Sequence, residues 1–254
     1  MQSLITKISA DDQIIKFLEA EKHINLNMRN YLSYDQNAEV YLYDGDIKNG
    51  VIAGNAGQDF FFASTECLNF IDEFWALLPG GHKVFSGVPA PTARVFEQRH
   101  NFVWQSYCNV YVFTGEFEEF ENPEYKAEAL TLEDAEEVNH YYTYKSEVSL
   151  KYICENILTM DSSCIRVNGE LAAWCMVHAE DGSMGPLYTK EEFRRLGLAK
   201  IITSRMINKL LAKEIIPYVQ IVSSNAASLN LIKGFEAMRY SHDCSWFGID
   251  KGNL

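Results

Sequence analysis

The 254-residue chain lacks any long run of apolar residues, although 47% of its residues are hydrophobic. No stretch approaches the ~18 apolar residues that a membrane-spanning helix needs, so the sequence predicts no transmembrane segment. Residues 1–17 mix charged and apolar side chains and contain no signal-peptide core. We therefore expect a folded cytoplasmic protein, with one large domain or two domains of about 125 residues each.

Paired cysteine motifs are also missing. The six cysteines are scattered along the chain, and no two of them form a Cys-x-x-Cys pair. Dispersed cysteines are typical of free thiols in a reducing compartment, rather than of a disulfide framework or a zinc site. The sequence therefore predicts neither disulfides nor a bound metal.

Positive charge is scarce, because 22 lysines and arginines face 35 acidic residues and the net charge is −13. Nucleic acids and anionic membranes select basic surfaces, so the composition argues against either as the main partner. Basic side chains nevertheless gather in one segment: Lys190, Arg194, Arg195, Lys200, Arg205, Lys209 and Lys213. Beside a phosphate-binding loop, such a cluster favours an anionic ligand over a merely solvated helix face.

The segment Met184–Lys200 predicts such a loop. A short apolar strand is followed by an acidic turn, and Arg194-x-x-Gly197-x-Ala199 then opens a helical pattern that continues to Lys213. The first N–H groups of a helix have no intrahelical partner, and the helix dipole favours negative charge there. Gly197 has no Cβ and lets the backbone come close to a ligand. The Gly-Lys-Ser/Thr ending of a P-loop and the three-glycine spacing of a dinucleotide fold are both missing.

Around this loop, the pattern predicts alternating helices and strands. The expected elements are a helix over 149–160, strands over 163–167, 170–178, 183–189 and 218–222, and a last helix that ends at 234–235. Asn168-Gly169 predicts a two-residue hairpin. Gly185-Pro186 predicts a β-bulge, because proline donates no ladder hydrogen bond.

This succession resembles the GNAT superfamily of acyl-CoA N-acyltransferases, especially its glycine N-acyltransferase and FR47-like branch. The shared features lie in about the last half of the chain: the Arg194–Ala199 loop, Asn225 with Ser228, Gly234-Phe235, Ala173-Trp174, Asp181-Gly182 and Leu187-Tyr188-Thr189. The resemblance implies an α/β fold with a mixed sheet. In that fold the strand before the loop splays from its neighbour, and the pantetheine arm of the ligand inserts between them.

The resemblance also implies acetyl-CoA, or another acyl-CoA, as co-substrate and no metal. The residues that it assigns to this ligand lie on the strand before the loop, in the loop and at the start of a later helix: Leu187, Tyr188, Thr189, Arg194, Arg195, Leu196, Gly197, Leu198, Ala199, Lys200, Asn225 and Ser228. Free backbone groups near Leu187 and Thr189 are expected to pair with the amides of pantetheine.

A weak internal repeat predicts two GNAT-like halves, over residues 1–120 and 121–254. Aromatic residues and a glycine recur at identical spacings: Phe102, Tyr107, Phe113 and Gly115 match Phe235, Tyr240, Trp246 and Gly248. Two cap-like patterns also recur, Ser9 with Asp12 before a helical pattern over 13–31, and Thr131 with Asp134 before one over 135–142.

The first half does not keep the loop chemistry. At the expected loop position no arginine precedes the helix over 67–78, and Asp59 and Glu66 would repel a pyrophosphate. We therefore interpret residues 1–120 as a degenerate half that serves as a packing partner and as one wall of the substrate cleft.

The catalytic groups implied by the resemblance are incomplete. Many family members place a glutamate base eleven residues before the first motif position, where this chain has Ser183. Glu180, Asp181 and His178 lie close by in sequence and are candidate bases. A tyrosine acid is expected seven residues after Asn225, where the chain has Ile232, so Tyr188 and Tyr240 are candidate substitutes. We take Glu180, Ser183 and Tyr188 as the catalytic candidates.

The leading hypothesis is an N-acyltransferase that moves an acetyl or other short acyl group to a primary amine of a small molecule or peptide. A catalytically weak CoA-binding or regulatory module is the first alternative, because the glutamate and tyrosine are missing. An aminoacyl-tRNA-dependent transferase of the tandem-GNAT type is the second, and the intact loop and acidic charge count against it. The expected partner is a small-molecule amine, without nucleic acid or membrane, and a homodimer is left open.

Overall fold

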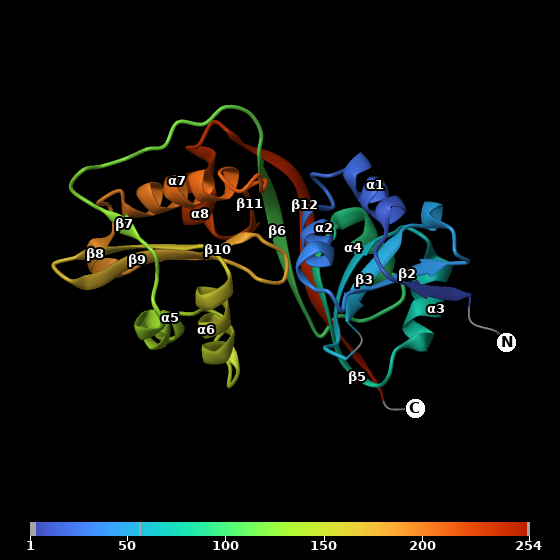
Figure 1. Ribbon diagram of the computed structural model, residues 1–254. Helices are drawn as coiled ribbons and strands as arrows, with labels where there is room; N and C mark the ends of the chain where they lie inside the picture. The colour runs from blue at the N-terminus through green and yellow to red at the C-terminus, as the bar shows by residue number, and fades with distance from the viewer. Residues whose placement is uncertain (1–3, 56, 253–254) are drawn as a thin grey trace. The chain divides into compact units, whose positions relative to one another are not determined.

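The computed structural model describes residues 4–55 and 57–252, which form two compact units (Figure 1). Unit 1 comprises the described residues up to Tyr111 together with 220–226 and those from Tyr240 onward. Unit 2 comprises residues 112–219 and 227–239. The units therefore do not follow a single cut in the chain, because C-terminal segments belong to unit 1. The division into two GNAT-like halves at residue 120 stays a prediction.

The regular elements alternate between helices and strands along the chain. The first part contains β1 (Ile5–Ile8), α1 (Asp12–Ala20), α2 (Leu26–Tyr34), β2 (Glu39–Tyr43), β3 (Val51–Asn55), β4 (Phe60–Ser64), α3 (Leu68–Leu77), β5 (Gly81–Pro89), α4 (Ala90–Glu97) and β6 (Trp104–Phe113). The second part contains β7 (Ala127–Glu128), α5 (Ala135–His140), α6 (Ser149–Thr159), β8 (Ser162–Val167), β9 (Glu170–Val177), β10 (Met184–Thr189), α7 (Leu198–Leu211), β11 (Tyr218–Val222), α8 (Ala226–Lys233) and β12 (Met238–Lys251). The strands form an eight-stranded sheet in the order β1-β2-β3-β4-β5-β12-β6-β11 and a four-stranded sheet in the order β10-β9-β8-β7.

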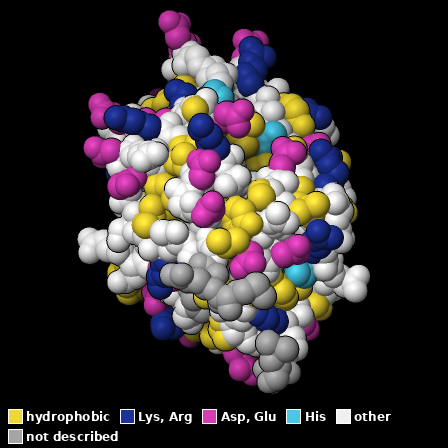
Figure 2. Space-filling view, turned by 90° about the vertical axis from the view of Figure 1, so that its right-hand side faces the viewer, with side chains coloured by type: hydrophobic (Ala, Val, Ile, Leu, Met, Phe, Trp, Pro, Cys, Tyr) yellow, Lys and Arg dark blue, Asp and Glu magenta, His cyan; other side chains and the backbone are white. Residues whose placement is uncertain are grey.

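The central strands of unit 1 are apolar on both faces, because helices cover both sides. Along β4, Phe61 packs into a core with α3 and α4, whereas the next residue, Phe62, packs into a second core with α1 and α2. Successive side chains of a strand point to opposite faces, so a continuous apolar run is what a sheet covered on both sides requires. Figure 2 shows acidic and basic side chains interspersed on the face of the molecule that it presents.

The helical pattern over 13–31 was predicted as one helix, and the structure divides it into α1 and α2. A turn interrupts the pattern, since the N–H groups of Ile24 and Asn25 both donate to the carbonyl of Glu21. The predicted Ser9 cap is also wrong. Asp11 caps α1 instead, because its Oδ1 accepts hydrogen bonds from the N–H groups of Gln13 and Ile14.

The predicted elements of unit 2 are confirmed with shifts of one or two residues at their ends. Asn168 and Gly169 both adopt positive φ angles, of 53° and 84°, and join β8 to β9 as a tight hairpin. The register of β10 against β9 shifts between Met184 and Leu187, which is the predicted bulge at Gly185-Pro186. Thr131 and Asp134 form the predicted capping box, at the short 3-10 turn before α5.

Helices cover both faces of the four-stranded sheet of unit 2. Figure 1 shows α7 along one face and α5 and α6 against the other. Trp174 and Met176 of β9 pack with α5 and α6 in one apolar core. The face of α7 that carries Ile202, Met206 and Ile207 is fully buried. The four-stranded sheet therefore holds the start of α7 and the end of β10 as one packed unit.

Candidate functional site

The predicted loop leaves an unpaired row of backbone donors at the start of α7. The helix begins at Leu198, after the short 3-10 turn Glu191–Phe193. Within the described chain, the N–H groups of residues 195–199 donate no hydrogen bond, and the first donors in this helix are those of Lys200 and Ile201. These free donors sit where the helix dipole favours an anion. The loop therefore has the chemistry of a phosphate site.

The backbone of this loop is shaped around Gly197. This residue is the N-cap of α7 and has a φ of 80°, in the left-handed region that glycine adopts without strain. No heavy atom lies within 4 Å of the position where a Cβ would stand. The position that a Cβ would occupy at Gly197 is therefore open.

Several basic side chains of the predicted cluster form ion pairs with acidic residues and are therefore not available to an anionic ligand. Lys190 pairs with Glu137 and Glu170, at 2.6 and 2.8 Å. Arg205 pairs with Glu119 at 3.2 Å, and Lys213 pairs with Asp161 at 2.6 Å.

The remaining cations of the cluster have different surroundings. Arg194 Nη1 contacts Glu191 at 3.3 Å, and Lys209 Nζ donates to the carbonyl of Ser162. Lys200 Nζ lies 4.0 Å from the ring centroid of Phe120. Arg195 makes no ion pair within the described residues, and its side chain is exposed. Arg195 and Lys200 are therefore the cations best placed to meet an anion at this loop.

Strand β10 provides a free edge beside the loop. In the described sheets it pairs with β9 alone, and β11 belongs to the other sheet. The Tyr218 hydroxyl nevertheless donates to the carbonyl of Asp181 at 2.7 Å, just before β10 begins. The predicted splay of the strand before the loop agrees with this arrangement.

At the end of β10, the backbone carbonyl of Thr189 is not free, contrary to the prediction from the sequence. This carbonyl accepts a hydrogen bond from Arg194 Nε at 3.2 Å. The hydroxyl oxygen of Thr189, however, is buried and has no hydrogen-bond partner among the residues that the structure describes. A buried polar atom without a partner is costly, so this hydroxyl fits a polar group of a ligand.

Ser183 lies in a closed turn and not at the surface. Its hydroxyl donates to Asp181 Oδ1 at 2.7 Å, and its N–H donates to the same oxygen at 2.9 Å. Both residues are buried, with 3% and 0% of their surfaces exposed. The carboxylate of Asp181 therefore holds the turn together, and Glu180 is the more accessible of the two acids.

Tyr152 joins the side chains of Glu180 and His178, which lie just before the bulge in sequence. The Tyr152 hydroxyl, from α6, donates to Glu180 Oε2 at 3.2 Å and also contacts His178 Nδ1. Burial raises the pKa of the Glu180 carboxyl above its ordinary value, and the nearby Asp181 charge adds to this. The structure thus brings Glu180 and His178 together and adds Tyr152, which the sequence patterns did not single out.

Gly185 explains why His178 can approach the bulge. A Cβ at this glycine would lie 3.0 Å from His178 Nε2. Tyr152 lies 26 residues before His178 in the sequence. The packing of α6 against β9 brings the two side chains together. No local sequence signal could have identified it.

The other predicted residues lie in varied surroundings. Tyr188 stacks on Tyr141, with ring centroids 4.9 Å apart, and lies 5.1 Å from Trp174. Asn225 immediately precedes α8, and Ser228 lies in its first turn. Ile232, at the position where the family tyrosine was expected, is buried. The aromatic packing of Tyr188 favours a structural part for its ring.

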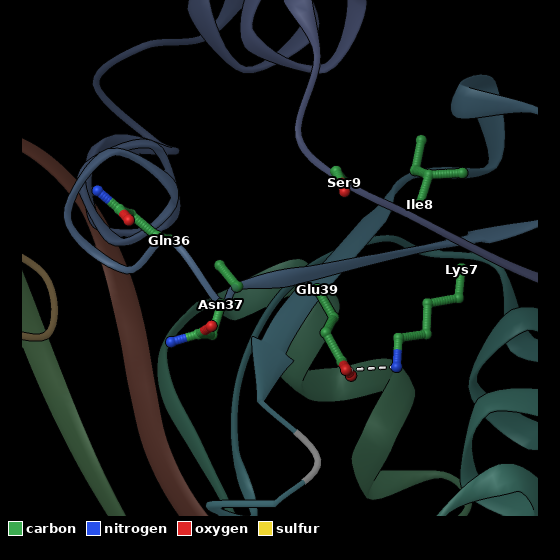
Figure 3. Close-up of a pocket in the computed structure, with 7 residues that line it drawn as sticks. Lys7, Ile8, Ser9, Gln36, Asn37 and Glu39 are labelled. Carbon is green, nitrogen blue, oxygen red and sulfur yellow. Dashed lines mark ion pairs between the residues drawn. The ribbon is translucent and has the colours of Figure 1, made fainter.

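A surface cavity of about 410 Å³ lies in unit 1, between β1 and the residues that lead into β2. Lys7 and Glu39 point toward each other there and form an ion pair (Figure 3). None of its lining residues is among the predicted site residues.

Two further properties concern metals and membranes. Within residues 4–55 and 57–252, no three histidine, cysteine, aspartate or glutamate side chains come together as metal ligands. Of the helices described, none has the length and apolar character that crossing a bilayer would need.

Comparison with known proteins agrees with this geometry. Residues 164–246 match the family model of the FR47-like protein, a range that includes the bulge, the loop and α7. The fold is that of the GNAT superfamily, and residues 164–246 carry the signature of its FR47-like branch. The predicted α/β fold class and the predicted resemblance are thereby confirmed. No curated protein matches the chain in sequence.

Solved structures share the fold over nearly the whole chain. A Drosophila protein has a TM-score of 0.76 at 16% identity, over 98% of this chain and 99% of its own. A GNAT-family protein from Novosphingobium aromaticivorans has a TM-score of 0.56 at 15% identity, over 91% and 99%. A GNAT-family acetyltransferase from Colwellia psychrerythraea has a TM-score of 0.53 at 12% identity, over 97% and 99%. At these identities, the likeness establishes the fold.

Proposed function

We propose that the protein is an acyl-CoA-dependent N-acyltransferase with one acyl-CoA site, at the start of α7. The observation that carries this proposal is the row of unpaired N–H groups at residues 195–199, in front of open space at Gly197. Helix N-termini with free donors bind phosphate groups. The GNAT fold of the chain and the FR47-like match over residues 164–246 support an acyl-CoA as the phosphate-bearing ligand.

Each part of the site has a role in this proposal. The loop Arg194–Lys200 would hold the pyrophosphate, with Arg195 and Lys200 adding positive charge. The free edge of β10 and the unpartnered hydroxyl of Thr189 would meet the pantetheine arm. Asn225 and Ser228 stay candidate contacts for the same arm. The bound thioester supplies the activated acyl group.

We assign the removal of a proton from the acceptor amine to Glu180. Its carboxylate is the side chain at the bulge that is suited to take the proton from an acceptor amine, and Tyr152 orients it by a 3.2 Å hydrogen bond. A carboxyl group whose pKa is raised by burial is a better base at neutral pH than an ordinary glutamate. Solvent can protonate the departing thiolate, because a free thiol has a pKa near ~8.5. A dedicated acid at the position of Ile232 is therefore not required.

Isothermal titration with acetyl-CoA tests the first part of the proposal. We expect about one site per chain, with no second site in unit 1. Two equal sites would contradict the interpretation of the first half as degenerate. Absence of binding in a folded sample would reject the loop as an acyl-CoA site.

A second candidate function is a CoA-binding module without turnover. It is favoured by the buried Ser183 and Ile232 at the positions of the expected base and acid. The two functions differ in one measurement, which is the release of free CoA thiol with a panel of amines. Binding without amine-dependent thiol release would support the module.

A further inference from the structure

Glu180 is a half-buried carboxylate with the His178 ring close by, and a positive charge on that ring would oppose the rise in the pKa of Glu180. Within the described residues, no lysine or arginine pairs with it, and its hydrogen-bond donor is the neutral hydroxyl of Tyr152. Removing an ionised carboxylate from water is costly unless a cation or several donors compensate it. A ligand cation would therefore compensate this carboxylate more fully than the chain itself does.

Other shielded acids of unit 2 show the contrast. Asp134, which is 5% exposed, lies 2.6 Å from Arg166 Nη2, and Asp161 lies 2.6 Å from Lys213 Nζ. The guanidinium of Arg166 and backbone hydrogen bonds hold the pKa of Asp134 below its ordinary value, although burial opposes this. The pKa of Glu180 shifts in the opposite direction. Asp134 and Asp161 thus have a permanently charged side chain beside them, whereas no lysine or arginine among the described residues pairs with Glu180.

Aromatic rings extend from Glu180 toward the solvent. We call Tyr142, Tyr144 and Tyr152 the tyrosine cluster. The ring centroids of Tyr142 and Tyr152 are 6.1 Å apart, and those of Tyr142 and Tyr144 are 6.0 Å apart. Burial and the nearby Glu180 charge raise the pKa of Tyr142 to about 12. Tyr144 is 63% exposed, so the cluster reaches from the carboxylate to open water.

We propose that Glu180 and the tyrosine cluster bind the acceptor as a primary ammonium ion that carries an aromatic or alkyl group and no carboxylate. This substrate class rests on the proposed acyl transfer. The ammonium would supply the missing counter-charge of Glu180, and tyrosine faces attract cations and apolar groups. An α-amino acid would instead bring a second carboxylate beside Glu180, where no lysine or arginine compensates it. The site therefore selects amines over amino acids.

Phenethylamine and phenylalanine form a matched pair of probes, because they differ only by the carboxylate. Binding is measured by calorimetry without any coenzyme, so the result does not depend on acyl-CoA binding. We expect phenethylamine to bind at least 10-fold more tightly than phenylalanine. Glu180→Gln should weaken phenethylamine binding at least 10-fold and reduce the preference.

Variants of the tyrosine cluster test the aromatic part. Tyr144→Leu should weaken phenethylamine binding severalfold, whereas Tyr144→Phe should keep it, since the ring face and not the hydroxyl makes the contact. Glu155→Gln is the matched control, because Glu155 is an exposed acid of the same helix as Tyr152. This control should bind both probes as the unmodified protein does.

The outcomes separate the inference from the proposed function. Equal binding of the two probes, stronger binding of phenylalanine, or no binding of either would overturn the substrate class. This holds whether or not the protein binds acetyl-CoA. Selective binding of phenethylamine that Glu180→Gln removes would support the site, even in a chain that fails to bind acetyl-CoA. Failure to bind acetyl-CoA would reject the proposed acyl transfer and would leave the amine site supported.

Discussion

Helices α3 of unit 1 and α7 of unit 2 each follow the end of a strand, but they begin in opposite ways. Before α3, the Thr65 hydroxyl oxygen accepts a hydrogen bond from the Cys67 N–H at 3.1 Å, and Thr92 Oγ1 accepts one from the Thr65 N–H at 3.2 Å. Before α7, the N–H groups of residues 195–199 have no such partner in the described chain. The residues that lead into α3 thus donate to side chains of unit 1, although its N-cap residue, Cys67, provides no side-chain cap. The residues that lead into α7 leave their N–H groups available to an anion.

Buried charges show the same difference. In unit 1 the ammonium of Lys83, 0% exposed, has an ion contact with Asp59 at 2.8 Å and donates to the carbonyl of Gly80 at 3.1 Å. In unit 2 no lysine or arginine among the described residues pairs with the carboxylate of Glu180. The acid that was expected to repel a pyrophosphate, Asp59, thus serves to compensate Lys83. This difference agrees with the proposal that the ligand chemistry lies in unit 2.

Gly197→Asp is expected to remove acyl-CoA binding, with a loss of affinity of 100-fold or more. The new carboxylate would stand in the open space before the free N–H groups, where its charge replaces that of a phosphate. Calorimetry with acetyl-CoA measures the loss, and circular dichroism checks the fold.

Gly197→Asn is the matched control for this variant. Asparagine tolerates the left-handed backbone about as well as aspartate and has nearly the same size, but it carries no charge. We expect a smaller loss than with aspartate. Equal losses would mean that the backbone shape and not the charge decides binding, and unchanged affinity in both would place the site elsewhere.

Glu180→Gln is expected to lower kcat by roughly 10²–10⁴-fold, which is the usual contribution of a general base. Because burial raises the pKa of Glu180, the unmodified enzyme should lose activity as the pH falls through a value above that of an ordinary glutamate. This acidic limb should disappear in the variant. Rates of thiol release between pH 5 and pH 9, about the range in which such a limb would lie, test this expectation.

Stability provides the control for Glu180→Gln. The folded state holds the proton of Glu180 more tightly than the unfolded state, so ionisation costs stability as the pH rises through the folded pKa. The variant should therefore be at least as stable as the unmodified protein at neutral pH. An unchanged kcat in the folded variant would remove Glu180 from the mechanism.

Local features could be predicted from the sequence. The Asn168-Gly169 hairpin, the bulge at Gly185-Pro186 and the start of α7 after Gly197 all depend on backbone preferences of a few neighbouring residues. The fold class followed from the same stretch, since the succession of elements around the loop is typical of one superfamily.

Long-range contacts could not be predicted in this way. β12 pairs with β5, across more than a hundred residues of chain, and no local pattern records that pairing. Arg205 and Lys213 were expected to serve an anion, but Glu119 and Asp161 neutralise them through tertiary contacts. Tyr152 reaches Glu180 only because α6 packs against the four-stranded sheet.

Asn27→Ala is expected to destabilise the protein by about 1–3 kcal/mol. The parallel pairing of β4 with β5 joins Phe60 and Phe61 to Val84 and Phe85. At the next residues of β5, the Asn27 amide donates to the carbonyls of Ser86 and Gly87, at 3.3 and 3.0 Å. In unit 1 a side chain thus occupies the kind of position that we propose for a ligand in unit 2. Urea unfolding measures the change, with the exposed Asn37→Ala as control.

Thr65→Ala is expected to cost about 1 kcal/mol of unfolding free energy, the smallest effect considered. The substitution removes the acceptor of the Cys67 N–H and the donor to the carbonyl of Asn49, so one more N–H group before α3 becomes free. It adds no glycine and no cation, and Glu66 stays beside the helix. The variant should therefore still bind one acetyl-CoA per chain with unchanged affinity. A second calorimetric site in Thr65→Ala would show that a single side chain closes unit 1, and that its helix start otherwise keeps the capacity to bind an anion.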